Sequence, residues 1–471
     1  MIDEDHAPCP VCAATAHREE RHLALLFIER ISDDRYRSAL RDGGGYCTAH
    51  ARELLGDRRG QQLGSAYESV LRRHAERLAD PAEAPPPMGV PSGCPVCVSA
   101  RRAEVDALSW LLDPQPAEDP VLTPRRDAPV CARHLAPLIA GAHWSQMGAL
   151  LERVRTTLDA AEAATTLQGR VGVLAGADLV GRRVRRLDDG LWKGARAGWA
   201  DGLVSPDGLD GELARGRCPL CTIGLAALLR SLGWIADAHA RRPSLLRDLP
   251  GLCGPHHWEA VTVASDAATW GVDVALGDWR ARLAQLPPAP ARTWGERLGQ
   301  HRALRRAEAT AGPRWRLGAT PRAALDAARP QQAVDAGIAA ALRRRPTCVA
   351  CRASDEPVAR AAALLGTRLM TPDGRARYAD QGSVCLRHLA TAWPHLDAAG
   401  RACVRDRALA TSALLRWRLQ EATRKDSWAV RYEPRGAELT AWRDALTAVT
   451  GTVVEQRQIL GPSGGEPAPA L

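Results

Sequence analysis

Twelve cysteines and four histidines recur in a pattern whose residue types and spacing suit metal binding. The pattern is C-x2-C, then a gap, then C-x2-H, and it occurs four times with 32 to 35 positions between the second and the third cysteine. Such constancy is typical of one structural unit copied four times. The four sets are Cys9, Cys12, Cys47 and His50; Cys94, Cys97, Cys131 and His134; Cys218, Cys221, Cys253 and His256; and Cys348, Cys351, Cys385 and His388.

Three thiolates and one imidazole form a closed donor set for Zn²⁺, which prefers four tetrahedral ligands of this kind. Because all four positions are taken by the protein, no position remains open for water or substrate, and the metal is predicted to be structural. We therefore expect about four zinc ions per chain. Iron–sulfur clusters stay open as a second choice of cofactor, since three cysteines and a histidine can hold one, although the tight C-x2-C-x2-C run of bacterial ferredoxins is absent.

The composition is that of an ordinary soluble protein. The chain has 471 residues, of which 45% are hydrophobic and 25% are charged, and this excludes a wholly disordered or fibrous protein. The start is acidic, and no uninterrupted apolar run is long enough to span a bilayer, so we expect a cytoplasmic protein without a transmembrane segment. Thirteen cysteines in a reducing compartment are not expected to form disulfides, and metal binding accounts for twelve of them.

The elements that must hold these ligands read as helices. Positions 11, 13 and 14 after the second cysteine of each set are apolar, a spacing that predicts a helix packed against the metal unit. Apolar residues 7 and 8 positions after the third cysteine predict a second helix, with the cysteine and histidine on its first turn. Both ligand pairs then lie near helix N-termini, where the helix dipole favours thiolates. The third set has adjacent histidines, and the register assigns His256 as the ligand and His257 as a packed neighbour.

The motifs themselves carry a resemblance. The segments Cys9-Pro10-Val11-Cys12 and Gly45-Tyr46-Cys47-Thr48-Ala49-His50 resemble an uncharacterised bacterial family, a domain of unknown function with paired C-P-x-C and G-[FY]-C-x2-H units. The resemblance implies a metal-bound helical fold and no particular reaction. This chain departs from that pattern by having four units where the family has two, and by lacking the proline in Cys348-Val349-Ala350-Cys351.

These observations together predict an all-α protein of four metal-stapled helical repeats, arranged as two pairs with helical inserts. In each unit a further helix is expected after the C-x2-H helix, over 61–79, 143–164, 266–286 and 400–423. The predicted segments are 1–80 (unit 1), 90–165 (unit 2), 166–213 (an insert with an apolar seam from Val173 to Leu191), 214–286 (unit 3), 287–343 (an Arg-rich helical insert), 344–424 (unit 4) and 425–471 (a C-terminal helix and a disordered tail).

The predicted function class depends on the closed metal sites and on the absence of known catalytic motifs from the sequence. No phosphate-binding loop, dinucleotide-binding fingerprint, nucleophile elbow or H-E-x2-H motif is present, so we do not expect an enzyme. The sequence favours a zinc-stabilised interaction scaffold for a protein partner, with an Fe–S electron-transfer or redox-sensing protein as the alternative. Nucleic-acid binding through the arginines of Arg292–Arg345, where the net charge over 286–345 is +8, is a weaker alternative. Cys403, outside the four sets, is interpreted as a small apolar filler.

Overall fold

The structure of this chain, a computed structural model, describes residues 9–55, 62–80, 83–113, 116–125, 127–141, 147–176, 205–214, 216, 218–284, 348–430 and 432–451. Within these ranges the chain forms α-helices and short 3-10 helices and no strand, which confirms the predicted all-α class. The Arg-rich insert 287–343 and most of the insert after unit 2 lie outside the described residues.

Three kinds of helix recur in each unit. The first begins directly after the first cysteine of C-x2-C, as in α1 (Pro10–Ala24), α5 (Pro95–Leu112), α12 (Pro219–Arg241) and α17 (Val349–Leu369). The second begins directly after the third cysteine, as in α3 (Thr48–Leu55), α6 (Ala132–Gly141), α13 (Gly254–Val263) and α19 (Leu386–Ala392). The third follows closely, as in α4 (Gly64–Leu78), α7 (Met147–Ala163), α14 (Ser265–Ala284) and α20 (Ala398–Lys425). The sequence predicted all twelve of these helices.

Shorter elements fill the connections between them. The other α-helices within the described ranges are α2 (Asp34–Asp42), α8 (Leu167–Ala175), α11 (Pro206–Ala214), α18 (Pro372–Gln381) and α21 (Ala441–Thr450). The 3-10 helices are Arg30–Ser32, Thr123–Arg125, Pro243–Leu246, Trp393–His395, Trp428–Val430 and Ala437–Thr440. Two of these helices, α8 and α21, prove to be important for the metal centres.

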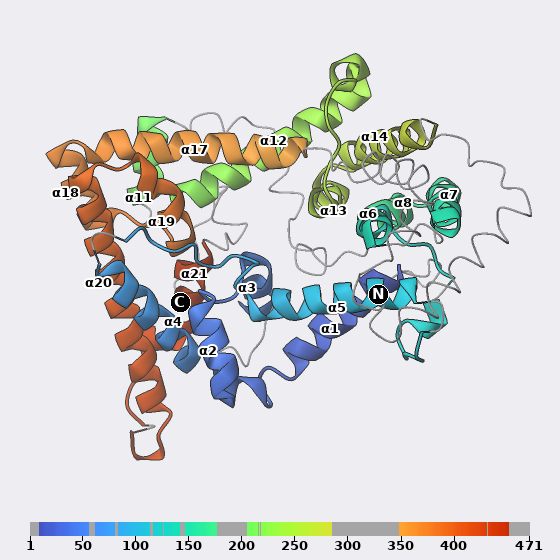
Figure 1. The fold of residues 1–471 in the computed structure, drawn as a ribbon. Coiled ribbons are helices and arrows are strands. Elements are labelled where there is room, and N and C mark those ends of the chain that lie inside the picture. Colours follow the sequence, from blue (N-terminus) through green and yellow to red (C-terminus); the bar gives the residue numbers. More distant parts are fainter. Residues whose placement is uncertain are drawn as a thin grey trace, which may run out of the picture.

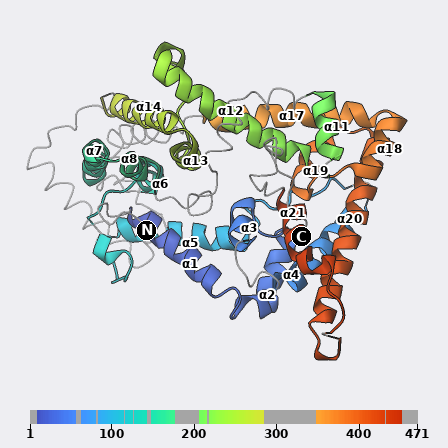
Figure 2. The same cartoon turned by 180° about the vertical axis from the view of Figure 1, so that it is seen from behind.

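Two long helix pairs form opposite sides of the molecule. Helix α1 packs along α5, and α12 packs along α17 (Figure 1). The two helices of each pair run antiparallel. The start of one helix therefore lies beside later turns of the other. The view from behind shows the same arrangement, with α1 and α5 below and α12 and α17 above (Figure 2). The chain is thus built from two pairs of units, as the sequence predicted.

The two halves of the chain, units 1 and 2 and units 3 and 4, contact each other through two short helices. Helix α8, the last helix described before the gap at residues 177–204, packs on α13 and α14 of the second half. The last short helix of the second half, α21, packs on α3 and α4 of the first half, where α20 also lies along α4. Each of these two short helices therefore packs on the first unit of the other half.

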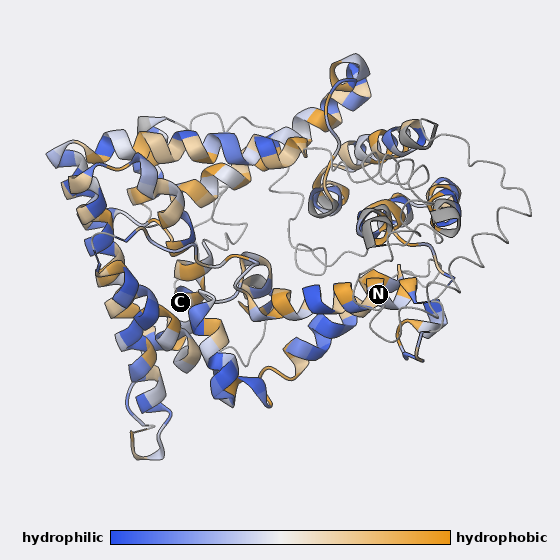
Figure 3. Cartoon of the chain, viewed as in Figure 1, coloured by the Kyte–Doolittle hydropathy of each residue, from blue (hydrophilic) through white to orange (hydrophobic). Residues whose placement is uncertain are grey.

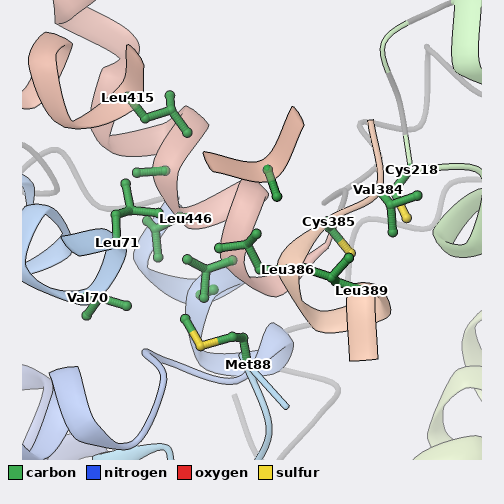
Figure 4. Packing of buried hydrophobic residues seen from close by; sticks show 14 of the residues in the cluster. Val70, Leu71, Met88, Cys218, Val384, Cys385, Leu386, Leu389, Leu415 and Leu446 are labelled. Carbon is green, nitrogen blue, oxygen red and sulfur yellow. The ribbon is translucent and has the colours of Figure 1, made fainter. Parts of the chain in front are cut away.

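The cores lie where these helices converge. Hydrophobic residues gather on the inward faces of the helices (Figure 3), and buried side chains such as Leu71, Leu415 and Leu446 bring α4, α20 and α21 together (Figure 4). The predicted apolar position 14 is buried at Ile235 and Leu365. Position 13 was a poorer guide, since Trp234 is 45% exposed. One residue turns a helix by about 100°, so this side chain lies on the flank of the core face.

Helix α12 is long and apolar enough, by length and composition, to cross a membrane, and it is the one such helix among the described residues. Most of it is buried in the protein, as in the core helix of a soluble domain. The structure describes only the start of the apolar seam predicted from Val173 to Leu191, and the seam beyond Gly176 lies outside the described residues. Helix α8 ends at Ala175, because Gly176 adopts φ +88° and turns the chain away.

Candidate metal centres

All sixteen predicted ligands lie in four compact groups, each with three cysteine sulfurs and one histidine nitrogen within 4.8 Å of one another. We call them sites 1 to 4. Site 1 contains Cys9, Cys12, Cys131 and His134; site 2 contains Cys47, His50, Cys94 and Cys97; site 3 contains Cys218, Cys221, Cys385 and His388; and site 4 contains Cys253, His256, Cys348 and Cys351.

The grouping of these ligands corrects the sequence-based expectation. The repeat predicted that each C-x2-C pair shares a metal with the C-x2-H pair of its own unit. In the structure each C-x2-C pair instead joins the C-x2-H pair of the other unit in its half. All four predicted sets are therefore wrong as sets, although each of their sixteen residues lies in one of the four groups.

Helix length explains the exchange of partners. Helix α1 has 15 residues and carries the chain about 20 Å away from Cys12. The return helix α2 has only 9 residues, so Cys47 and His50 lie beside the later turns of α1, where His50 is next to Glu19. Because α5 runs antiparallel to α1, the first residues of α5 lie at that same end, and they supply Cys94 and Cys97. The same relation holds for α12 and α17 in the second half.

The distances within each site fit a tetrahedron around a single ion. A metal–sulfur distance of about 2.3 Å places sulfurs at tetrahedral corners about 3.8 Å apart. The sulfur pairs Cys12–Cys131, Cys47–Cys97, Cys221–Cys385 and Cys253–Cys351 are 3.7, 3.6, 3.7 and 3.8 Å apart. In an iron–sulfur cluster two ligands on the same iron keep a similar spacing, and ligands on different irons lie farther apart.

In every site the histidine presents Nδ1 to the sulfurs. Nδ1 of His50 is 3.2 to 3.5 Å from the sulfurs of its site, and Nδ1 of His388 is likewise 3.2 to 3.5 Å from its sulfurs. The corresponding range for His134 is 3.2 to 3.6 Å, and for His256 it is 3.2 to 3.4 Å. A shared orientation of this kind leaves Nε2 to interact with the surrounding protein.

Each C-x2-C pair stands at a helix start. The predicted position near helix N-termini is confirmed, since Cys9, Cys94, Cys218 and Cys348 are the N-caps of their helices, and none of them makes a side-chain capping hydrogen bond. The sulfurs are thus free to face the site while the positive end of the helix dipole favours their anionic form.

Within one site, ionisation of one thiol makes ionisation of its neighbours less favourable. Hydrogen bonds from Cys94 and Cys97 lower the pKa of Cys47 far below its ordinary value, whereas the hydrogen bond to Cys47 raises the pKa of Cys97. In site 4 the hydrogen bond from Cys253 lowers the pKa of Cys348 to about 3, and burial raises the pKa of Cys351 to about 11. Three sulfurs this close ionise together only beside a cation, so the donor set fits a divalent metal.

A carboxylate lies beside the histidine in three of the four sites. Nε2 of His50 is 3.6 Å from Oε1 of Glu19, and Nε2 of His134 is 3.3 Å from Oε1 of Glu104. Nε2 of His256 is 3.5 Å from Oε2 of Glu259, on its own helix. Carboxylates in this position orient a ligating histidine and fix its tautomer. Sequence reasoning missed Glu19 and Glu104, although both stand seven positions after the second cysteine of a C-x2-C pair.

Two glycines close one site in each half. A Cβ atom on Gly176 would lie 2.8 Å from Cys12 Sγ and 3.1 Å from Cys131 Sγ. A Cβ atom on Gly451 would lie 2.7 Å from Cys221 Sγ. Both glycines follow a short helix, α8 or α21, and have φ of +88° and +93°. The backbone therefore approaches the sulfurs of sites 1 and 3 as closely as only glycine permits.

Hydrogen bonds tie these two closing turns to the other half. Trp258 on α13 donates from Nε1 to the carbonyl oxygen of Gly176 at 3.1 Å. Thr48 on α3 donates from its hydroxyl to the carbonyl oxygen of Thr450, directly before Gly451, at 2.9 Å. Because Thr48 follows Cys47 and Trp258 lies two residues after His256, each contact links two sites from different halves.

The sites differ in burial. All four residues of site 1 are buried, whereas in site 4 only Cys348 is buried and the other three are partly exposed. His257 is packed beside site 4, 3% exposed, with Nδ1 3.2 Å from the carbonyl oxygen of Cys253, so the choice between the adjacent histidines agrees with the geometry. Cys403 is half-buried and donates to the carbonyl oxygen of Arg375, away from the sites.

No protein-family model matches the chain, and no curated protein or solved structure is significantly similar to it. The four cysteine–histidine groups are the part of the resemblance that the structure shows.

Proposed function

We propose that this protein is a scaffold held together by four structural zinc ions. The observation that carries the proposal is the distance of 3.6 to 3.8 Å between sulfurs brought together from different units, which matches the edge of a single-ion tetrahedron. Zinc in such a closed Cys3His set supplies folding energy and crosslinking rather than catalysis.

The positions of the four sites support this role. Sites 1 and 2 lie at opposite ends of the α1–α5 pair, and sites 3 and 4 lie at opposite ends of the α12–α17 pair. Each ion would therefore crosslink two units at a point where a long helix begins. Thiolate ligands of this kind persist in a reducing compartment, so we place the protein in the cytoplasm.

Metal analysis of protein purified without oxygen tests the proposal. We expect close to four zinc ions per chain, no acid-labile sulfide and no absorption in the visible region. Iron and sulfide in stoichiometric amounts, with a brown chromophore, would instead identify an Fe–S protein. Iron without sulfide would keep the single-ion geometry and replace only the metal.

We further propose that the scaffold presents a surface to a protein partner. Helix α20 carries Leu414 and Trp417 one turn apart, 48% and 60% exposed. Exposed apolar side chains that lie next to each other mark interaction surfaces more often than isolated ones. A photo-crosslinking residue at position 417 should give a discrete adduct in cells, whereas the same residue at the exposed position Glu152 should not. Equal labelling at both positions would contradict this assignment.

A further inference from the structure

Sites 1 and 2 are each contacted by a carboxylate from the helix that begins at the other site. Glu19 lies on α1, the helix that supplies Cys9 and Cys12 to site 1, but its carboxylate lies beside His50 of site 2. Glu104 lies on α5, the helix that supplies cysteines to site 2, but its carboxylate lies beside His134 of site 1.

Helix geometry explains why one helix reaches both sites. Seven residues separate Cys12 from Glu19, and seven separate Cys97 from Glu104. Two helical turns carry the carboxylate about 10 Å along the helix axis. Because α1 and α5 are antiparallel and a site lies at the start of each, this displacement carries each carboxylate to the site of the other helix.

Burial indicates that these contacts are structural. Glu19 is 8% exposed, and the ring of His50 is fully buried. The Glu104 side chain is 24% exposed and the His134 side chain is 1% exposed. A buried carboxylate needs a positively polarised partner, and the N–H group at Nε2 of a metal-bound histidine is one.

The second half provides an internal comparison. The residues seven positions after Cys221 and Cys351 are Leu228 and Val358, which cannot accept a hydrogen bond. There His256 lies beside Glu259 of its own helix α13 instead. The reciprocal contact is thus a feature of the α1–α5 pair, and the α12–α17 pair lacks it at these positions.

From this geometry we infer that Glu19 and Glu104 are positioning residues. Glu19 positions His50 of site 2, and Glu104 positions His134 of site 1. The inference rests on the proposed function, since it requires metal at both sites. It implies that sites 1 and 2 bind metal cooperatively, because the helix fixed by one ion holds the carboxylate that supports the other. The coupling is reciprocal, as the thermodynamics of two linked sites requires.

The test follows each cysteine separately in the full-length, zinc-loaded protein. During a challenge with a chelator, pulses of a thiol-alkylating reagent followed by peptide mass spectrometry give the rate at which each site loses zinc. Glu104→Ala should speed alkylation of Cys9, Cys12 and Cys131 by about 10-fold to 100-fold, the usual effect of losing a carboxylate behind a ligating histidine. Glu104→Gln, which keeps an acceptor without the charge, should have a smaller effect in the same direction.

The diagnostic result is that the effect crosses between helices. Cys94 and Cys97, on the same helix as the replaced Glu104, should be released later than the cysteines of site 1, because the coupling between the sites acts only after site 1 has lost its metal. Glu19→Ala should do the opposite and expose Cys47, Cys94 and Cys97 before Cys9 and Cys12. The control Glu152→Ala removes an exposed carboxylate from α7 and should change no rate.

Two results would overturn the inference. Release of Cys94 and Cys97 first by Glu104→Ala would show local damage to α5, and unchanged rates at site 1 would show that the carboxylate does not support His134. Both differ from failure of the proposed function, in which added zinc would protect none of the twelve cysteines in the unmodified protein.

Discussion

Cys12 and Cys131 are 119 positions apart in the chain, and their sulfurs lie 3.7 Å from each other. This pair makes the exchange of ligands between units directly testable by zinc content. Each of Cys12→Ser, Cys131→Ser and Cys47→Ser should remove one zinc ion. The double variant of Cys12 and Cys131 should also lose only one ion, because both belong to site 1, whereas the double variant of Cys12 and Cys47 should lose two. The reverse pattern would restore the grouping of ligands by unit.

Gly176 should tolerate no side chain, whereas Gly172, on the preceding helix α8, should tolerate one. Gly176→Ala places a methyl group 2.8 Å from Cys12 Sγ at φ +88°, and we expect a loss of about 1 to 3 kcal/mol in the free energy of unfolding. Gly172→Ala meets no atom within 4 Å, so stability should stay the same or rise by about 1 kcal/mol. Chemical denaturation of both variants measures the difference. Equal effects would show that Gly176 does not close site 1.

The hydroxyl of Tyr67 should hold the turn that leads into site 2. The backbone N–H of Tyr46 donates to this hydroxyl at 3.2 Å, and Tyr46 is directly followed by Cys47. Tyr67→Phe leaves that buried N–H without its acceptor, which costs about 1 to 3 kcal/mol. We expect a lower melting temperature and faster zinc loss from site 2. Tyr432→Phe, at a residue that is 81% exposed, is the control and should change neither.

Acid should destabilise the protein partly through His74. Burial, with a smaller effect of Arg77, lowers the pKa of His74 to about 4 from an ordinary value of 6.5. At a pH between these two pKa values, His74 binds a proton in the unfolded state but not in the folded state. The contribution to stability is therefore complete above pH 6.5 and is lost as the pH falls towards 4, by about 3 kcal/mol at most. His74→Leu should flatten the pH dependence of unfolding by this amount, and parallel curves for the two proteins would contradict the assignment.

The identity of the ligands and the starts of the helices could be read from the sequence because they are local properties. Cys9 and Cys94 are each followed by a proline, which suits the first position of a helix, and the cysteine before it becomes the N-cap. The offsets after each cysteine then gave the helical period. These features depend on neighbours within one or two turns.

The grouping of the ligands could not be read in the same way. Every unit has almost the same spacing, so Cys12 has two chemically equivalent partners, the C-x2-H pair of its own unit and that of the next. Only the lengths of α1 and α2 together decide between them. The contacts of Glu19 and Gly176 depend on the packing of helices from different units, and no single-unit pattern contains that information.

The exchange of ligands also sets the order in which the sites can form during synthesis. All ligands of site 2 lie between the two ligand pairs of site 1, and all ligands of site 4 lie between those of site 3. The inner sites close shorter loops, 44 positions between His50 and Cys94 against 119 between Cys12 and Cys131, at a lower entropic cost. At roughly 5 to 20 residues per second, Cys12 leaves synthesis about 6 to 24 seconds before Cys131. A growing chain should therefore gain its metals in the order 2, 1, 4, 3, with Gly176 and Gly451 arriving only after the outer site of each half has all its ligands.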